Sequence, residues 1–276
     1  MSKPNNAPAK SSSSSSKNNE MFSGLVIVAA LILSFILFYT LMGAKGNFEG
    51  GDSVKGHPLN TLGLVFKGGP IVPLLMTCAM CVIVFSVERF LTIRAATGNG
   101  SVADFVKRVQ SNLNGNNVDA AIGECDKQKG SVANVVRSGL VKYKEMMGNH
   151  ELDKDAKIAS IQQEVEEATA LEMPMLNKNM PILSTIASVG TLIALLGTVL
   201  GMIKSFSAMA NAGAPDASAL STGISEALIN TALGIGTSAV AIIMYNFFTT
   251  KIDALSYRID EASFSMGQTF STHHGK

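Results

Sequence analysis

Apolar residues gather in four long blocks along the chain, and polar segments carrying most of the charge separate them. The block at 22–42 contains no charged residue, and the last block, at 222–248, is interrupted only by Glu226 near its start. A helix needs about 20 mostly apolar residues to cross the hydrocarbon core of a membrane. The pattern therefore predicts four membrane-spanning helices.

The longest polar stretch lies between the second and third apolar blocks, and its apolar residues recur at helical spacing without strand-like alternation. Ser101 followed by Asp104 is typical of a helix start, and Gly115 and Gly130 punctuate the stretch. An apolar stripe predicts a further long helix from Asp153 onward. Its members are Ile158, Ile161, Val165, Ala168, Leu171 and Met175. We expect a helical polar domain, with a bend near Pro174 and Pro181.

The expected fold is an all-α membrane protein whose long helices extend into this polar helical domain. We expect the pair Glu88 and Arg89 to mark the return of the second span to water. The expected segments are a disordered tail at 1–20, a transmembrane helix at 21–43, a loop at 44–69, a transmembrane helix at 70–90, the helical domain at 91–180, a transmembrane helix at 181–204, a loop at 205–221, a transmembrane helix at 222–250 and a C-terminal tail at 251–276. The first apolar block is too long for an ordinary signal-peptide core, so we expect it to be retained.

Basic residues predict the orientation of the spans. All lysines and arginines fall in the two tails, the helical domain or next to it, except Lys45, Lys55, Lys67 and Lys204. Because basic residues accumulate on the cytoplasmic side of a membrane, both termini and the helical domain are expected inside the cell.

Composition excludes several classes of protein. The chain of 276 residues is 47% hydrophobic and 16% charged, with a formal net charge of +1. These values argue against a soluble enzyme, and the even charge balance argues against a nucleic-acid partner. Cys78, Cys81 and Cys125 are too few and too oddly spaced for a disulfide framework. We expect all three to serve packing.

Glu226 is the first candidate functional residue, because an ionisable group within an apolar segment is costly and is often functional. Its position near the start of the last span leaves an alternative open. The carboxylate could instead snorkel to the water at the membrane surface.

The last two spans carry matching faces of small and polar residues. Gly197, Gly201 and Gly234 stand among hydroxyl residues at three- and four-residue intervals. Such faces let helices approach closely, which is sufficient to explain them as packing surfaces. The alternative is that the hydroxyls and amides line a narrow wet path.

Other chemistries lack the residues they need. All four histidines, His57, His150, His273 and His274, lie outside the apolar blocks, and no metal-ligand spacing or phosphate-binding loop occurs. We therefore expect no catalytic residue, no metal, no cofactor and no enzymatic activity.

Two stretches closely resemble the ExbB/TolQ/MotA group of proton-channel proteins, and within it the ExbB/TolQ branch. They are ILSTIASVGTLIALLGTVLGMIKSF at 182–206 and GISEALINTALGIGTSAVAIIMYN at 223–246. The resemblance extends over about 70–259, with weaker matches at Glu88–Arg89 and at SVANVVRSGL, 131–140. It implies three family-type transmembrane helices, to which this chain adds an N-terminal span.

The resemblance also implies a mechanism and partners. Family members form a ring, expected to be a pentamer, around an ExbD- or TolR-like single-span protein whose intramembrane aspartate carries protons. Thr198 and Thr231 match the pore threonines, Glu226 matches the membrane glutamate, and Asn230 stands where many members have alanine. We expect a bacterial inner-membrane protein, surrounded by lipid, that converts the proton motive force into work on a TonB-like protein for outer-membrane import. TolQ-type envelope constriction, a gliding stator and a non-conducting scaffold remain alternatives.

The sequence departs from the family pattern at other positions too. Val240 stands where many members have proline, so this chain lacks the residue that the resemblance associates with a kink in the last span. The N-terminal span is expected to affect partner choice or ring packing.

Overall fold

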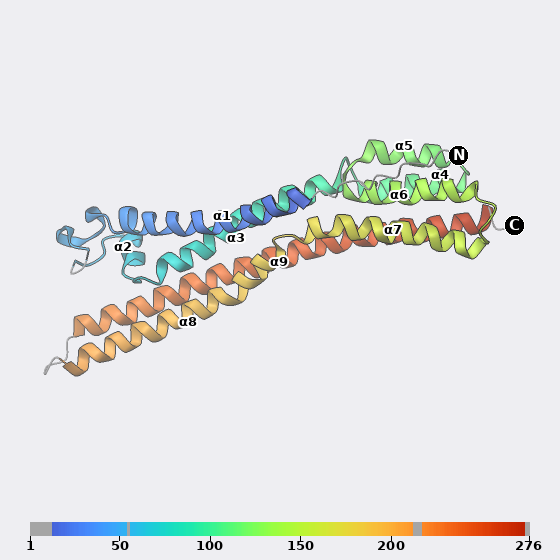
Figure 1. Cartoon of the computed structure of the whole chain (residues 1–276). Coiled ribbons are helices and arrows are strands. Elements are labelled where there is room, and N and C mark those ends of the chain that lie inside the picture. Colours follow the sequence, from blue (N-terminus) through green and yellow to red (C-terminus); the bar gives the residue numbers. More distant parts are fainter. Residues whose placement is uncertain (1–12, 54–55, 212–216, 274–276) are drawn as a thin grey trace. The chain divides into compact units, whose positions relative to one another are not determined.

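The protein is predominantly helical in the part that the computed structural model describes, namely residues 13–53, 56–211 and 217–273 (Figure 1). No β-strand occurs in those residues, and their one isolated β-bridge joins Phe48 to Pro58. The predicted all-α class is therefore confirmed.

The helices follow one another with short connections. In chain order they are α1 (Ser13–Leu37), a π-helix (Phe38–Met42), 3₁₀ turns (Lys45–Asn47 and Glu49–Gly51), α2 (Thr61–Phe66), α3 (Val72–Thr97), α4 (Val102–Asn114), α5 (Val118–Gln128), α6 (Gly130–Met147), α7 (Lys154–Asn177), α8 (Met180–Asn211) and α9 (Ala217–His273).

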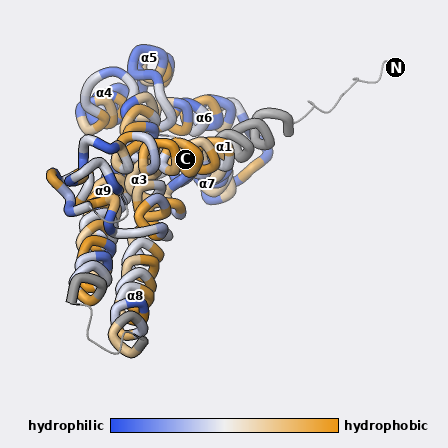
Figure 2. Tube along the Cα trace, turned by 90° about the vertical axis from the view of Figure 1, so that its left-hand side faces the viewer, coloured by the Kyte–Doolittle hydropathy of each residue, from blue (hydrophilic) through white to orange (hydrophobic). Residues whose placement is uncertain are grey.

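Four helical segments are long and apolar enough to cross a membrane: Ser23–Met42, Val72–Asn114, Lys154–Ser207 and Leu220–His273. Figure 2 shows the contrast in composition, because α8 is mostly white and orange whereas much of α5 is blue. The expectation of four spanning helices in a multi-pass membrane protein is supported by their length and composition.

The first helix begins earlier than the sequence pattern suggested. We expected a disordered tail at 1–20, but α1 begins at Ser13, and residues 1–12 lie outside the described part of the chain. Once an apolar segment has formed a helix, adding residues to its end costs little because nucleation is already complete.

The described residues divide into two compact units. The first comprises the described parts of Met1–Ile83 and Ile186–Val240, and the second those of Val84–Thr185 and Ala241–Lys276. The helices α3, α8 and α9 each contribute to both units.

In the first unit an aromatic cluster holds the additional N-terminal helix. The rings of Phe38 and Phe66 stack at 4.7 Å between centroids, and Phe48 meets Phe66 edge-on at 5.5 Å. About one turn before Phe38, the hydroxyl of Ser34 in α1 donates to the sulfur of Met80 in α3 at 3.4 Å. Ser34 is buried, so this part of α1 is packed within the unit.

The second unit contains a helical bundle with a large apolar core. Its helices begin as the sequence predicts, since Ser101 accepts from the backbone N–H of Asp104 and Asp153 from that of Ala156. Within the core the rings of Tyr143 and Phe270 pack edge to face at 5.0 Å. Burial raises the pKa of Tyr143 to about 12, as expected for a phenol in an apolar core.

A buried arginine lies where we expected the second span to return to water. Arg89 is 1% exposed, and its Nη1 donates to the backbone oxygens of Met175 and Leu176 at 3.0 Å each. Its Nε donates to Glu88 at 2.6 Å, so the buried charge is paired. The helix α3 continues through this pair to Thr97.

The predicted bend between the long amphipathic helix and the third span lies after Pro174. The helix α7 runs through that proline to Asn177, and α8 starts at Met180. Asn179, in the break, has a φ of 62°, a left-handed conformation that asparagine tolerates better than most residues. Its side-chain Nδ2 donates to the carboxylate of Glu88 at 3.2 Å, so this hydrogen bond links the connection between α7 and α8 to α3.

Candidate functional site

The helices α8 and α9 run antiparallel within the first unit and touch through their smallest residues. A Cβ added to Gly234 would lie 2.2 Å from the Cβ of Ala194, and one added to Gly197 would lie 2.8 Å from that of Asn230. At Gly201 the added atom would lie 2.9 Å from the backbone oxygen of Gly223. The structure thus places the three predicted packing glycines where the facing helix leaves no room for a Cβ.

Two threonine hydroxyls meet across this contact. The Oγ1 atoms of Thr198 and Thr231 lie 2.5 Å apart, and both side chains are half-buried. Thr198 also lies 3.1 Å from the backbone oxygen of Ala194, and Thr231 lies 3.0 Å from that of Ala227. The structure brings together two residues that are 33 positions apart in the sequence.

The threonine pair has fewer protons than hydrogen bonds. Each hydroxyl carries one proton, so two protons serve the bond between Thr198 and Thr231 and the two bonds to backbone oxygens. Whichever threonine donates to the other gives up its own backbone bond. The pair can therefore reverse its direction by rotating two hydroxyls, and it can both donate to and accept from a third group.

Glu226 is buried, yet its carboxylate has an exposed partner. The residue is 7% exposed, and Lys204, whose side chain is 67% exposed, approaches Oε2 at 2.9 Å. The other oxygen, Oε1, packs on Gly69, where an added Cβ would lie 2.0 Å away. The geometry combines elements of both sequence-based alternatives: the carboxylate lies inside the protein and is connected to its surface through the lysine.

Asn230 contacts the segment before α3. It is fully buried, and its Nδ2 donates to the backbone oxygen of Gly68 at 2.9 Å. Its Oδ1 has no hydrogen-bond partner among the described residues. Because Gly68 and Gly69 contact Asn230 and Glu226 respectively, this pair of glycines lies against one face of α9.

Sequence reasoning missed Lys204 and the two glycines as members of the site. Lys204 was considered only as one of the few basic residues expected on the outer side of the membrane. The sequence did contain information on this contact. If two antiparallel helices place Thr198 opposite Thr231, the end of α8 must lie beside the start of α9. That register places Lys204 near Glu226.

The three cysteines add no reactive group to the candidate site. Burial raises the pKa of the Cys125 thiol to about 12, so the thiol is neutral and unreactive near pH 7. Cys78 and Cys81 lie inside α3. Among the described residues no group of three or more potential metal ligands occurs.

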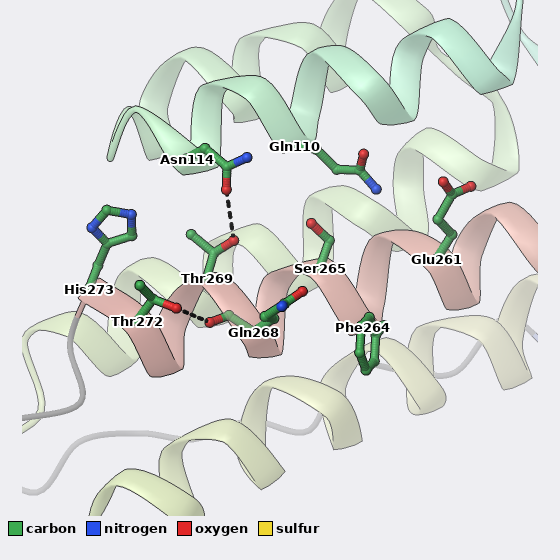
Figure 3. A pocket seen from close by; sticks show the side chains of 9 residues that line it. All are labelled: Gln110, Asn114, Glu261, Phe264, Ser265, Gln268, Thr269, Thr272 and His273. Atoms are coloured by element: carbon green, nitrogen blue, oxygen red, sulfur yellow. Dashed lines mark hydrogen bonds between the residues drawn. The ribbon is translucent and has the colours of Figure 1, made fainter.

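A polar pocket of about 410 Å³ lies in the second unit between α4 and the last turns of α9 (Figure 3). In the view, Asn114 of α4 faces Thr269 of α9, and these two form a hydrogen bond of 3.4 Å. Glu261, at the rim, is bound to Arg258 at 2.7 Å. None of the predicted pathway residues lines this pocket, and its amides and hydroxyls form no recognisable reactive set.

Residues 127–261 match the family model described as the MotA/TolQ/ExbB proton channel family. This stretch, just under half of the chain, is similar to that family. It includes Thr198, Glu226, Asn230 and Thr231 but not the N-terminal helix α1. The predicted resemblance is therefore confirmed at the level of the family.

One curated relative is the Tol-Pal system protein TolQ of Pseudomonas aeruginosa. It is 26% identical over 124 residues, which is 45% of this chain and 54% of that protein. The chain thus spans about half the length of the curated relative that it matches. The relative supports the family and leaves the choice between the ExbB and TolQ branches open.

Proposed function

We propose that this protein is a subunit of a proton-driven motor in the bacterial inner membrane. The observation that carries the proposal is the pair of facing hydroxyls of Thr198 and Thr231, 2.5 Å apart on the small-residue face of α8 and α9. The match of residues 127–261 to the proton-channel family supports the proposal.

In this proposal the threonines solvate a carboxyl group supplied by another protein. The partner is a single-span ExbD- or TolR-like subunit with an intramembrane aspartate, enclosed by a ring of five copies of this chain. A neutral carboxyl needs an acceptor for its proton and a carboxylate needs donors. A reversible hydroxyl pair can serve both states without titrating itself.

The driving force sets how many protons the motor needs. One elementary charge moving through 100 mV yields about 2.3 kcal/mol, so a mechanical step against a folded partner needs several protons. The work is transmitted to a protein outside the membrane part of the complex.

Glu226 and Lys204 serve at the outer end of the path. With both termini and the helical bundle in the cytoplasm, the α8–α9 connection lies on the periplasmic side. The exposed lysine keeps the buried carboxylate neutralised as an ion pair at 2.9 Å. Asn230 acts as a positioning residue, because its bond to Gly68 holds the segment before α3 against α9.

The primary output that we propose is ExbB-like: work on a TonB-like protein that energises import through outer-membrane receptors. A second candidate is a TolQ-type role in envelope constriction, favoured by the named relative from the Tol-Pal system. A gliding stator and a non-conducting scaffold, which would use the small residues for packing alone, are the remaining alternatives.

The test is proton uptake into liposomes that contain the full chain co-purified with its single-span partner, under an imposed potential. Thr198→Val and Thr231→Val keep the side-chain shape but remove the hydroxyls. Each should reduce uptake about tenfold, the equivalent of one lost hydrogen bond of about 1.4 kcal/mol in the path. Thr191→Val is the matched control, because Thr191 is exposed in α8 and donates to the backbone oxygen of Ser188, with no other hydrogen bond among the described residues.

Wild-type uptake by an assembled complex with both valines would overturn the proposed path and favour the scaffold. The outputs are separated in cells lacking the gene. Loss of receptor-mediated import with an intact envelope supports the ExbB-like role, whereas envelope leakage with normal import supports the TolQ-type role.

A further inference from the structure

A small groove in the second unit lies between α3 and α9. Its volume is about 190 Å³. Its lining residues are Phe90, Ile93, Arg94, Thr97, Phe247, Phe248 and Lys251. Four of these side chains are purely apolar and two are cationic, a combination that suits an amphipathic anion.

The apolar wall of the groove remains open to contact. Phe90 is 50% exposed and Phe247 is 44% exposed, whereas Phe248 is 1% exposed and forms the floor. The rings of Phe247 and Phe248 meet edge-on at 5.4 Å, which fixes the wall against the floor. The groove thus offers an exposed aromatic surface of the kind that packs against an acyl chain.

The two cations at the groove have no carboxylate partner among the described residues. Two other arginines of this unit do have such partners, because Arg108 pairs with Glu124 at 2.6 Å and Arg137 with Asp126 at 3.2 Å. Lys251 instead lies over the ring of Phe247 at 5.7 Å. The charge of Arg94 and Lys251 is available to an external anion.

The groove also lies where two spanning segments become polar. In α3 the charge-free run ends just before Glu88, and Phe90 and Arg94 follow within two turns. In α9 the apolar run ends at Phe248, and Lys251 follows within one turn. Aromatic rings followed by basic residues are typical of the headgroup level of a membrane, and basic pockets between helices on the cytoplasmic side bind anionic headgroups.

We propose that this groove binds one anionic phospholipid of the cytoplasmic leaflet. The phosphate lies between Arg94 and Lys251, and the upper part of one acyl chain lies on Phe90 and Phe247. About 190 Å³ holds only part of a lipid, so the rest of its chains remain in the bilayer. The site requires a membrane-embedded chain but not proton conduction, so it stands independently of the proposed motor.

The test measures lipid retention by the full chain, purified in a neutral detergent, with native mass spectrometry during titration with phosphatidylglycerol or phosphatidylcholine. A cation near an anionic headgroup contributes about 1 kcal/mol, or about fivefold in affinity. The double variant Arg94→Gln/Lys251→Gln should therefore bind phosphatidylglycerol about 25-fold more weakly. Arg94→Lys/Lys251→Arg should keep nearly all of the affinity because it retains both charges.

The matched control is Lys107→Gln/Lys154→Gln. It removes the same charge from two exposed lysines of the same unit, for which no ion pair occurs among the described residues, and it should leave binding unchanged. Phe247→Ala should weaken phosphatidylglycerol binding without creating a preference for phosphatidylcholine. Glycerol 3-phosphate at millimolar concentration should not compete, because it lacks an acyl chain.

Equal retention of both lipids, or undiminished phosphatidylglycerol binding by Arg94→Gln/Lys251→Gln, would overturn the proposal. Full competition by glycerol 3-phosphate would make this a site for a soluble phosphate. A change in oligomeric mass with unchanged lipid retention would make the groove an interface between copies of this chain. Both of the last two results also reject the lipid.

Discussion

The α8–α9 contact and the helical bundle around α6 are both helix packings, but they use opposite kinds of residue. The bundle buries large apolar side chains, such as Phe105, Leu140 and Phe270, at 0% exposure. The α8–α9 contact buries glycines and hydroxyls, and many of its large apolar residues face outward, including Leu195 at 61% exposure.

The surroundings of each region explain this difference. In water, burying apolar surface drives packing at roughly 25 cal/mol per Å². In lipid an outward leucine is already in an apolar medium, so close backbone approach and hydrogen bonds supply the stability. A polar pair such as Thr198 and Thr231 can therefore occupy the centre of a membrane contact, where a soluble core would place leucine.

The largest expected effect is in the bundle. Phe105→Ala should lower the free energy of unfolding by about 3–5 kcal/mol, because it removes a ring that is 0% exposed and leaves a cavity. Thermal or denaturant unfolding in detergent measures the change, with hydrogen exchange of the second unit as the readout. Phe264→Ala is the control, since Phe264 is 69% exposed and its loss should change stability by about 0.5 kcal/mol or less. Equal effects of the two would contradict the assigned core.

The second effect concerns the α8–α9 contact. Gly234→Ala adds one methyl group where Ala194 is 2.2 Å away, so the helices must separate at a cost of about 1–3 kcal/mol. Gly236→Ala, two residues along the same helix, meets nothing within 4 Å and should be neutral or slightly stabilising. Cysteine crosslinking yield between α8 and α9 and thermal stability in detergent report the separation. If Gly234→Ala is as stable as Gly236→Ala, the helices do not pack through this face.

The smallest effect is at the surface of the bundle. Lys127 and Arg108, each 2.6 Å from Glu124, hold the pKa of that carboxyl below its ordinary 4.5. A lowered folded-state pKa adds stability above pH 4.5, and this stability is lost as the pH falls through the folded value. Glu124→Gln should therefore cost about 0.2–1 kcal/mol at pH 7 and nothing well below pH 4.

Denaturant titrations at several pH values measure that difference. Glu151→Gln, at an exposed carboxylate, provides the comparison. A cost of Glu124→Gln that persists unchanged into strong acid would contradict the ion-pair explanation. High salt should also reduce the cost at neutral pH, because these charges are solvent-accessible.

The four spans, the all-α class and the helix starts at Ser101 and Asp153 could be predicted from the sequence because each depends on neighbouring residues. Apolar runs, caps and helical periodicity are local signals. The family could be predicted as well, because its motifs are contiguous in 182–206 and 223–246.

Contacts between residues far apart in the sequence could not be predicted. Glu88 and Arg89 follow the end of an apolar run, a pattern that indicates where a span ends but not what the charges contact. Arg89 is buried, since the carbonyls at the end of α7 supply its hydrogen bonds. Those carbonyls are more than 80 positions away in the sequence.

The sequence by itself determined that the chain makes long apolar helices and which of their faces are small and polar. Only the tertiary structure decided that Lys204 neutralises Glu226, that Asn230 holds Gly68, and that Arg94 and Lys251 share a groove with aromatic rings. The physical reason is that hydrophobicity and capping act over a few residues, whereas ion pairs and grooves depend on the register between helices. That register is set by the close approach of glycines such as Gly234, where one methyl group would alter it.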